Sequence, residues 1–373
     1  MKKFFIFAVA AVVATAACTK VNVDNTPDQA ITFQVAKYLS QTKADSHGHT
    51  SLIDEGYTSF KTWAWYTPAT GTANQAFMAP ATVEYDATNK YWHATDRSYF
   101  WPKTGYVNFF SFAGSIAPTS VALNTSDCCE ATYTDATIAT NSNILAADGA
   151  YGFFSNPSAT HGLDNVTSGV PTLFRHMLSR VKFDINVDAR GVSDNKNKWE
   201  VVVNSAVVKY RNQGTLVVSY PATPSISFDA DGHPTAAGTT QAFSAVWTPK
   251  SVANAELSKV SAAVEPFANG GELGTAVELI ADSVVMPQDL TATNATIELN
   301  YTITHTYDGG NAIVETVPVA AKTLVSFATP VSQWNRNTIY TYHITINPNG
   351  EILFDPAVEE WVNETIEPSY TIQ

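Results

Sequence analysis

Apolar and polar residues alternate in short runs along most of this chain. The runs are bounded by Gly, Pro, Asn or Asp, and no window longer than about ten residues repeats with the period of a helix. The clearest predicted strands lie in the second half, at 199–210, 214–220, 295–307, 312–320, 338–346 and 351–354. Short strands at this spacing are typical of antiparallel β-sandwiches, so the pattern predicts an all-β protein.

The residue types that make up the pattern change near residue 170. Between residues 57 and 112 Trp, Tyr and Phe are dense enough to predict one aromatic core. A polar stretch at 155–171 follows, and then Val181, Phe183, Ile185 and Val187 alternate as a new strand. We therefore expect two domains that meet near residue 170, with the polar stretch 188–198 as the alternative boundary.

Two strand-like segments lie near the ends of the chain. Near the amino terminus Ile31, Phe33 and Val35 fall on one face, which predicts a half-buried strand. Near the carboxy terminus one face is apolar and carries Ile366, Pro368, Tyr370 and Ile372. Pro368 cannot donate to a ladder, which indicates an edge or inserted strand. The tail completes either a sheet of its own molecule or, by β-augmentation, a groove in a neighbour.

The first residues have the form of a secretory signal. A charged start, Met1-Lys2-Lys3, precedes an apolar run at 4–14 and the small residues before Cys18. The run is shorter than the roughly 20 residues that a membrane-spanning helix needs, so we expect removal of residues 1–17. The segment resembles the lipobox of bacterial lipoproteins, with Thr15 where Leu is usual. The alternative is an ordinary secretory signal followed by a chance cysteine.

Composition and charge narrow the possible functions. The formal charge is −13, which repels phosphate backbones and argues against nucleic-acid binding. Beyond Cys18 the only cysteines are Cys128 and Cys129. Neighbouring cysteines bridge only through a strained ring, so we expect two loop thiols rather than a disulfide framework.

A search for catalytic or metal-binding patterns gives weak candidates. The sequence lacks HExxH, GxSxG and GxxxxGK[ST], so we expect no enzyme, metal site or cofactor. His47 and His49 lie in a polar loop that we expect to meet solvent, and His176 follows an apolar run as a core or turn histidine. The segment 229–232, Asp-Ala-Asp-Gly, is a fragment of a calcium loop that better fits a tight turn.

Several short motifs occur in an order that suggests a family. They are Ile31-Thr32-Phe33, Phe100-Trp101-Pro102, Leu173-Phe174-Arg175-His176, Met286-Pro287-Gln288, Trp334-Asn335-Arg336-Asn337 and Val358-Glu359-Glu360-Trp361. With them, nearly all of the chain resembles the fimbrillins of Bacteroidetes, including their Mfa-like subunits.

The resemblance implies two transthyretin-like antiparallel β-sandwich domains, at 18–170 and 171–373, and transport to the outer membrane as a lipoprotein acylated on Cys18. It also implies polymerisation by strand exchange. A protease would remove the strand of Ile31, Phe33 and Val35, and a neighbour's strand at 366–372 would replace it. Family members commonly carry Arg at the cleavage point. Here the candidates are Lys37 and Lys43-Ala44, because the first arginine is Arg97.

Two classes of function follow. The first is a structural or adhesive subunit of a cell-surface fimbria, whose partners are other fimbrial subunits, the outer membrane before assembly, and a host protein or glycan. The second is a lipoprotein that does not polymerise and binds glycan or host protein through aromatics of 57–112. Asp282-Ser283-Val284 also resembles the O-glycosylation pattern of this bacterial phylum.

Overall fold

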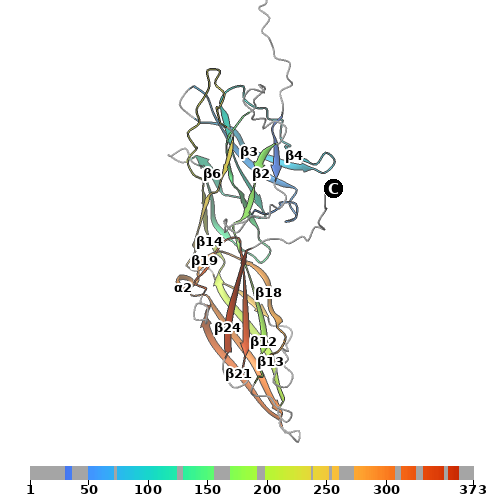
Figure 1. The fold of residues 1–373 in the computed structure, drawn as a ribbon. Helices are drawn as coiled ribbons and strands as arrows, with labels where there is room; N and C mark the ends of the chain where they lie inside the picture. Colours follow the sequence, from blue (N-terminus) through green and yellow to red (C-terminus); the bar gives the residue numbers. More distant parts are fainter. Residues whose placement is uncertain are drawn as a thin grey trace, which may run out of the picture.

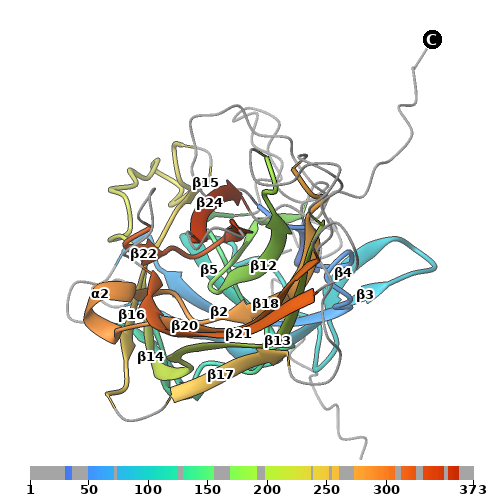
Figure 2. The same cartoon turned by 90° about the horizontal axis from the view of Figure 1, so that it is seen from below.

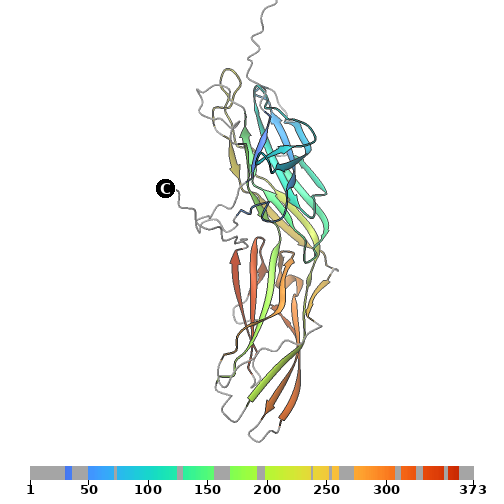
Figure 3. The same ribbon diagram turned by 90° about the vertical axis from the view of Figure 1, so that its right-hand side faces the viewer.

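The computed structural model confirms the predicted all-β class. It describes residues 30–35, 49–70, 74–123, 129–154, 169–190, 198–236, 238–251, 254–259, 273–306, 312–324, 331–347 and 352–360. These residues form β-strands and one four-residue helix, α2 (Leu290–Thr293). The strands build two groups of sheets stacked end to end, here named the upper and lower groups (Figures 1 and 3).

The upper group contains a ten-stranded and a four-stranded sheet. The main path of the larger sheet runs in the order β10 (Val170–Thr172), β1 (Thr32–Val35), β4 (Tyr91–Ala94), β3 (Gln75–Asp86), β2 (Ser59–Thr67), β5 (Tyr106–Gly114), β8 (Ile144–Ala147) and β11 (Phe174–His176). Off this path, β9 (Gly149–Phe153) joins β5 to β15 (Thr239–Gln241). The smaller sheet has the order β16 (Ser244–Pro249), β14 (Gln213–Ser219), β7 (Cys129–Thr137) and β6 (Ser120–Leu123).

The larger sheet curls on itself. Strands β10 and β11 lie at the two ends of its path, yet only residue 173 separates them in the chain. A flat sheet of these strands would place its two ends many strand spacings of about 4.8 Å apart. The one-residue connection therefore requires the sheet to bend until its ends meet, and β1 becomes an inner strand of the curled wall.

The aromatic residues of the first half divide between two cores, because successive side chains of a strand point to opposite faces. Phe60, Trp92 and Phe109 belong to the core inside the curled sheet. Trp65 and Phe110 belong to the core between the curled sheet and the four-stranded sheet. The prediction of one aromatic core was wrong, since the curled sheet itself separates the two sets of side chains.

The lower group is a two-layered β-sandwich. One sheet has the order β18 (Val277–Val285), β12 (Ser179–Val187), β23 (Thr338–Ile346) and β24 (Ile352–Glu360). The other has the order β17 (Asn254–Lys259), β13 (Lys198–Arg211), β20 (Thr296–Thr306) and β21 (Ala312–Thr323). Figure 2 shows the two layers end-on, and the alternating apolar residues of both line one core between them.

Strand direction differs from the prediction at two places. The six second-half segments form strands as expected, but the pairing is not purely antiparallel. Strand β1 runs parallel to β10, and β12 runs parallel to β23. Parallel partners need long connections, and both pairs join segments more than a hundred residues apart. Alternation along the chain reports burial but carries no signal for strand direction.

Between its described strands, the chain passes from one group to the other three times. It descends between β11 and β12, returns between β13 and β14, and descends again between β16 and β17. At this waist, β19 (Gln288–Asp289) pairs with β22 (Gln333–Trp334). The boundary predicted near residue 170 stays a prediction. The strand pairing adds that residues 170–176 and 213–249 contribute strands to the upper group.

Candidate functional site: the first-strand slot and its anchor

Strand β1 fills a slot between two strands of the curled sheet. It pairs in parallel with β10 (Phe33 beside Val170) and antiparallel with β4 (Phe33 beside Trp92). Just before the strand, the amide of Ile31 donates to the Tyr99 carbonyl at 2.7 Å. Because β1 is hydrogen-bonded along both edges, its removal would expose a row of unpaired backbone groups on β4 and on β10.

Apolar side chains of β1 and of the residue before it enter the core. Ile31 and Phe33 are only 2% and 3% exposed, and the predicted face of the strand is confirmed. The Phe33 ring meets the rings of Phe60 and Phe109 edge-on, with centroids 5.6 and 5.8 Å apart. Val35 is half-buried against the same core. Burying an Ile or Phe side chain stabilises a fold by about 1.5–3 kcal/mol, so β1 is held mainly by apolar contact and its two ladders.

Gly169, the residue before β10, lets this segment of the chain approach β1 closely. Its φ is +74°, in the left-handed region that favours glycine. A Cβ at this position would lie 3.0 Å from the carbonyl carbon of Phe33 and 3.1 Å from the amide nitrogen of Gln34. Any side chain at residue 169 would press on the backbone of β1, so only glycine fits at this position beside the slot.

A buried ionic cluster anchors the segment 49–57, which lies just before β2. His49 Nε2 is 2.8 Å from Asp148 Oδ2, and Arg175 binds both oxygens of the same carboxylate at 2.8 and 2.9 Å. All three side chains are at most 5% exposed. Burial pushes the pKa of Asp148 upward, but the hydrogen bonds from His49 and Arg175 outweigh it and the pKa is lowered.

A second buried pair lies in the same cluster. Glu55 Oε1 is 3.0 Å from Nε2 of His176, which is fully buried, and Glu55 Oε2 accepts from Asn143 Nδ2 at 2.9 Å. Burial raises the pKa of Glu55, but the contacts with His176 and the bonds from Thr50 and Asn143 leave it lowered. The segment 49–57 is thus tied to β11 and to the two residues that flank β8 by two carboxylates with short polar contacts.

Only part of this cluster follows from the amino-acid sequence. His176 is the core histidine that was predicted, but the expectation that His49 meets solvent was wrong, since its side chain is 4% exposed. His47 lies outside the described residues. Asp148, Arg175 and Glu55 were not recognised as partners. A signal existed, because Asp148 and Arg175-His176 stand inside otherwise apolar runs, where charged residues need a partner.

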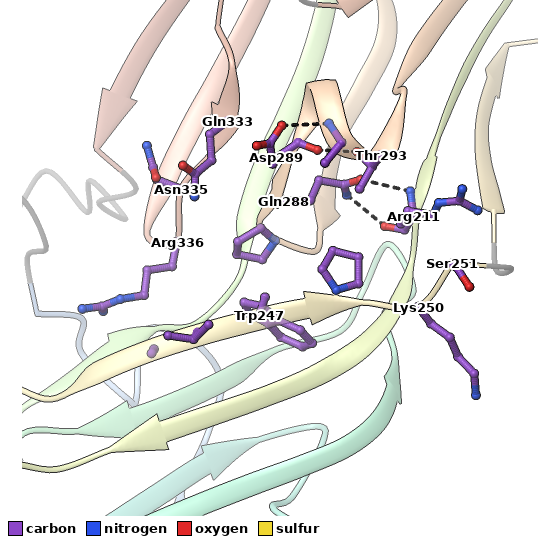
Figure 4. Close-up of a pocket in the computed structure, with 15 residues that line it drawn as sticks. Arg211, Trp247, Lys250, Ser251, Gln288, Asp289, Thr293, Gln333, Asn335 and Arg336 are labelled. Atoms are coloured by element: carbon purple, nitrogen blue, oxygen red, sulfur yellow. Dashed lines mark hydrogen bonds between the residues drawn. The ribbon is translucent and has the colours of Figure 1, made fainter.

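Two of the sequence motifs meet at the waist. Gln288 Nε2 donates to the Arg211 carbonyl at 2.9 Å, and its Oε1 accepts from the Arg211 amide at 3.1 Å. The Asn337 amide donates to the Leu178 carbonyl at 2.8 Å, and the Asn335 carbonyl accepts from the Ser179 hydroxyl at 2.6 Å. Each motif therefore binds backbone atoms of a segment that passes between the two groups. Figure 4 shows the bonds from Gln288 to Arg211.

Other residues named from the sequence have structural surroundings. Cys129 is unbridged and fully buried at the start of β7, so it is not a loop thiol, and Cys128 lies outside the described residues. The tight turn at Asp229 is confirmed, with its carboxylate accepting from the amides of Asp231 and His233. Ser283 is 8% exposed in β18, which leaves its hydroxyl little accessible for glycosylation.

The remaining candidates of the sequence analysis fall outside the described residues. They are Cys18, Lys37, Lys43, Ala44, Ile366, Pro368, Tyr370 and Ile372. Within the described ranges, no group of three or more His, Cys, Asp or Glu side chains is placed to hold a metal ion. No helix in that part of the chain is long and apolar enough to cross a membrane.

The fold and the slot define a β-sandwich protein built from extended strands, in which a first strand completes the sheet. The chain matches the model of the fimbrillin-like family over residues 42–361, and it therefore belongs to that family. No curated protein sequence matches the chain.

Solved structures that match the chain include a fimbrial protein from Bacteroides vulgatus ATCC 8482. It is 14% identical, the match covers 89% of this chain and 99% of that one, and the TM-score is 0.49. The fimbrilin FimA of Porphyromonas gingivalis W83 is 11% identical, with coverages of 90% and 99% and a TM-score of 0.36. The tip fimbrial protein Mfa3 of Porphyromonas gingivalis is 11% identical, with coverages of 83% and 96% and a TM-score of 0.32.

Proposed function

We propose that this protein is a structural or adhesive subunit of a cell-surface fimbria that polymerises by strand exchange. Membership of the fimbrillin-like family supports the class. The observation that carries the mechanism is β1, a strand near the amino terminus that lies between two other strands and buries Ile31 and Phe33. A neighbour's strand with the same alternation could replace it without rearranging the rest of the sheet.

In this proposal the subunit is exported as a lipoprotein. The signal 1–17 is removed, Cys18 is acylated, and the lipid holds the protein at the outer membrane before assembly. A single acyl chain gives only marginal membrane binding, so stable anchoring requires two or three. Removal of β1 would also remove Cys18, because the cysteine precedes the strand in the chain. Release from the membrane and opening of the slot would then be one event.

A protease would cut between β1 and the anchored segment 49–57. The candidate positions Lys37 and Lys43-Ala44 lie in this interval. The vacated slot would accept residues 366–372 of another subunit, with Ile366, Pro368, Tyr370 and Ile372 directed at the core. Pro368 suits a donated strand only where its missing N–H faces away from the ladder, which fixes the register of the exchange.

Electron microscopy of protease-treated protein tests this proposal. We expect filaments after a trypsin-like protease removes β1, and none from a Lys37→Ala/Lys43→Ala variant treated in the same way. A chain that ends at residue 363 should be cut normally but remain monomeric. Filaments whose subunits retain an amino terminus at Cys18, shown by mass spectrometry, would refute removal of the first strand.

The alternative function, glycan or host-protein binding through the aromatics of 57–112, receives little support from burial. Of these aromatics, only Tyr91 and Phe100 are prominently exposed, at 38% and 45%. Most of the others lie in the two cores of the upper group. Stacking on a sugar requires an accessible ring face, and a buried ring offers none.

A further inference from the structure

Strand β16 presents a free edge at the waist. It pairs with β14 on one side and lies at the end of its sheet. The amide of Lys250 donates to the carbonyl of Gln213, the first residue of β14, and the direction of the backbone groups alternates along a strand. The backbone groups of Ala245, Trp247 and Pro249 therefore point away from β14. No other strand of the described part of the chain pairs with this edge.

A groove of about 540 Å³ runs along this edge, within the size range of ligand sites. Figure 4 shows it between β16 and the opposite wall, which is formed by β19, α2 and β22. Trp247, Pro249 and Pro287 supply apolar surface. The indole of Trp247 is fixed, because its Nε1 donates to the Met177 carbonyl at 2.9 Å. The groove is therefore open along an edge that has backbone donors and acceptors.

The charge of the groove is opposite to that of the chain. Arg211, Lys250 and Arg336 line it, together with the single carboxylate of Asp289. That carboxylate already accepts from two amides at the start of α2. Lys250 is paired with Asp135 at 2.9 Å, whereas Arg211 has no side-chain bond among the described residues. In a protein of net charge −13, this local excess of cations favours an acidic occupant.

We infer that this groove is a second docking site, which binds an extended acidic peptide strand against the free edge of β16. The strand would bond to the backbone of Ala245 and Trp247, rest on the apolar floor, and place a carboxylate near Arg211. Pro249 has no N–H, so it limits the ladder to the part of β16 before it. This site is separate from the first-strand slot and does not require removal of β1.

Photo-cross-linking in the uncut, full-length protein tests this site, because β1 then still occupies the slot. A benzoylphenylalanine replaces Val246, which is 60% exposed on the groove rim. The probe is a synthetic isotope-labelled peptide with the sequence of residues 362–373, which contains Glu364 and Glu367. We expect a cross-link to the peptide that weakens as salt rises. A cross-link to the protein's own, unlabelled tail would equally show an acidic strand in the groove.

Three variants of the protein and one of the peptide separate specific docking from chance contact. Reversing Arg211 with Arg211→Glu, or replacing both peptide glutamates by lysine, should lower the cross-link yield about fivefold. Ala245→Pro removes an outward N–H without touching the β14 ladder and should lower it about tenfold. Lys103→Glu makes the same charge change at an exposed position outside the groove and should leave the yield unchanged. Absence of any cross-link, or a yield indifferent to Arg211 and to Ala245, would overturn the inference.

Discussion

The first strand and the segment 49–57 lie on either side of residues 36–48, and only the segment 49–57 adds buried ionic contacts to backbone bonds and apolar packing. Strand β1 is fixed by two backbone ladders and by apolar side chains such as Phe33. The segment 49–57 is fixed by the backbone bond from Thr50 to Phe174 and by the buried Leu52, and in addition by the buried contacts His49 to Asp148 and Glu55 to His176. Apolar contact accepts any strand with the right alternation, whereas an ionic cluster accepts only its own partners.

This difference would make β1 replaceable and the segment 49–57 fixed. In the proposed strand exchange, β1 would benefit from contacts that another sequence can reproduce. After the proposed cleavage, the segment 49–57 would lie close to the new start of the chain and would have to stay in place without β1. The buried cluster can hold the segment 49–57 in place through specific side-chain contacts. A substitute strand would not reproduce these contacts. The predictions below test whether the two regions are separable in this way.

Replacing Asp148 should give one of the two largest effects. Asp148→Asn leaves the Arg175 guanidinium buried without its counter-charge, and breaking such a pair costs about 3–5 kcal/mol. Urea unfolding measures the loss. The matched control is Glu298→Gln, which breaks the half-exposed pair with Lys209 and should cost at most about 1 kcal/mol. Equal losses in the two variants would contradict an anchoring role for the cluster.

Replacing Phe33 should weaken the hold on β1 rather than on the segment 49–57. Phe33→Ala removes a buried ring that contacts Phe60 and Phe109, at a cost of about 3–5 kcal/mol. Hydrogen exchange should rise in β1, β4 and β10 and remain low at 49–57. The half-buried Val35→Ala serves as the milder control. Exchange that rises equally in both regions would show that they are not separable.

Gly169→Ala tests how closely the slot fits β1. The left-handed backbone costs an alanine about 1–2 kcal/mol, and the contact with the β1 backbone adds to this. Gly56→Ala is the matched control, because Gly56 has a φ of +82° and open space around its Cβ position. The extra loss at Gly169, read from melting temperatures, measures the contact. Equal losses in melting temperature in the two variants would mean that the backbone of β1 can shift away from residue 169 at little cost.

The smallest expected effect is on the pH dependence of stability. The pKa values of Asp148 and Glu55 are lowered in the fold from ordinary values of 3.8 and 4.5. Their stabilisation is therefore fully present above about pH 5 and is lost as the pH falls below about 4 through the folded pKa values. Urea midpoints between pH 2.5 and 6 should fall less steeply in Asp148→Asn than in the natural protein. Parallel curves of urea midpoint against pH would show that other groups cause the loss of stability in acid.

Local pattern predicted the strands, while side-chain partners across the chain remained out of reach. The face of Ile31 and Phe33 follows from alternation alone, as does the strand 338–346. The pairing of Asp148 with Arg175 depends on how β8 and β11 align, and the parallel pairing of β1 with β10 on the curl of the sheet. Neither the register between distant strands nor their direction is encoded in a local period.

The path of the chain through the waist has a mechanical consequence. Three covalent passages between described strands join the upper and lower groups, so a pull along the long axis divides among them instead of loading a single linker. A fragment ending at residue 170 would lack β14 and β16, and the rest would lack the sheet that those strands join. The two halves cannot be produced apart by one cut, and a subunit under traction should extend only after strands slide out of their sheets.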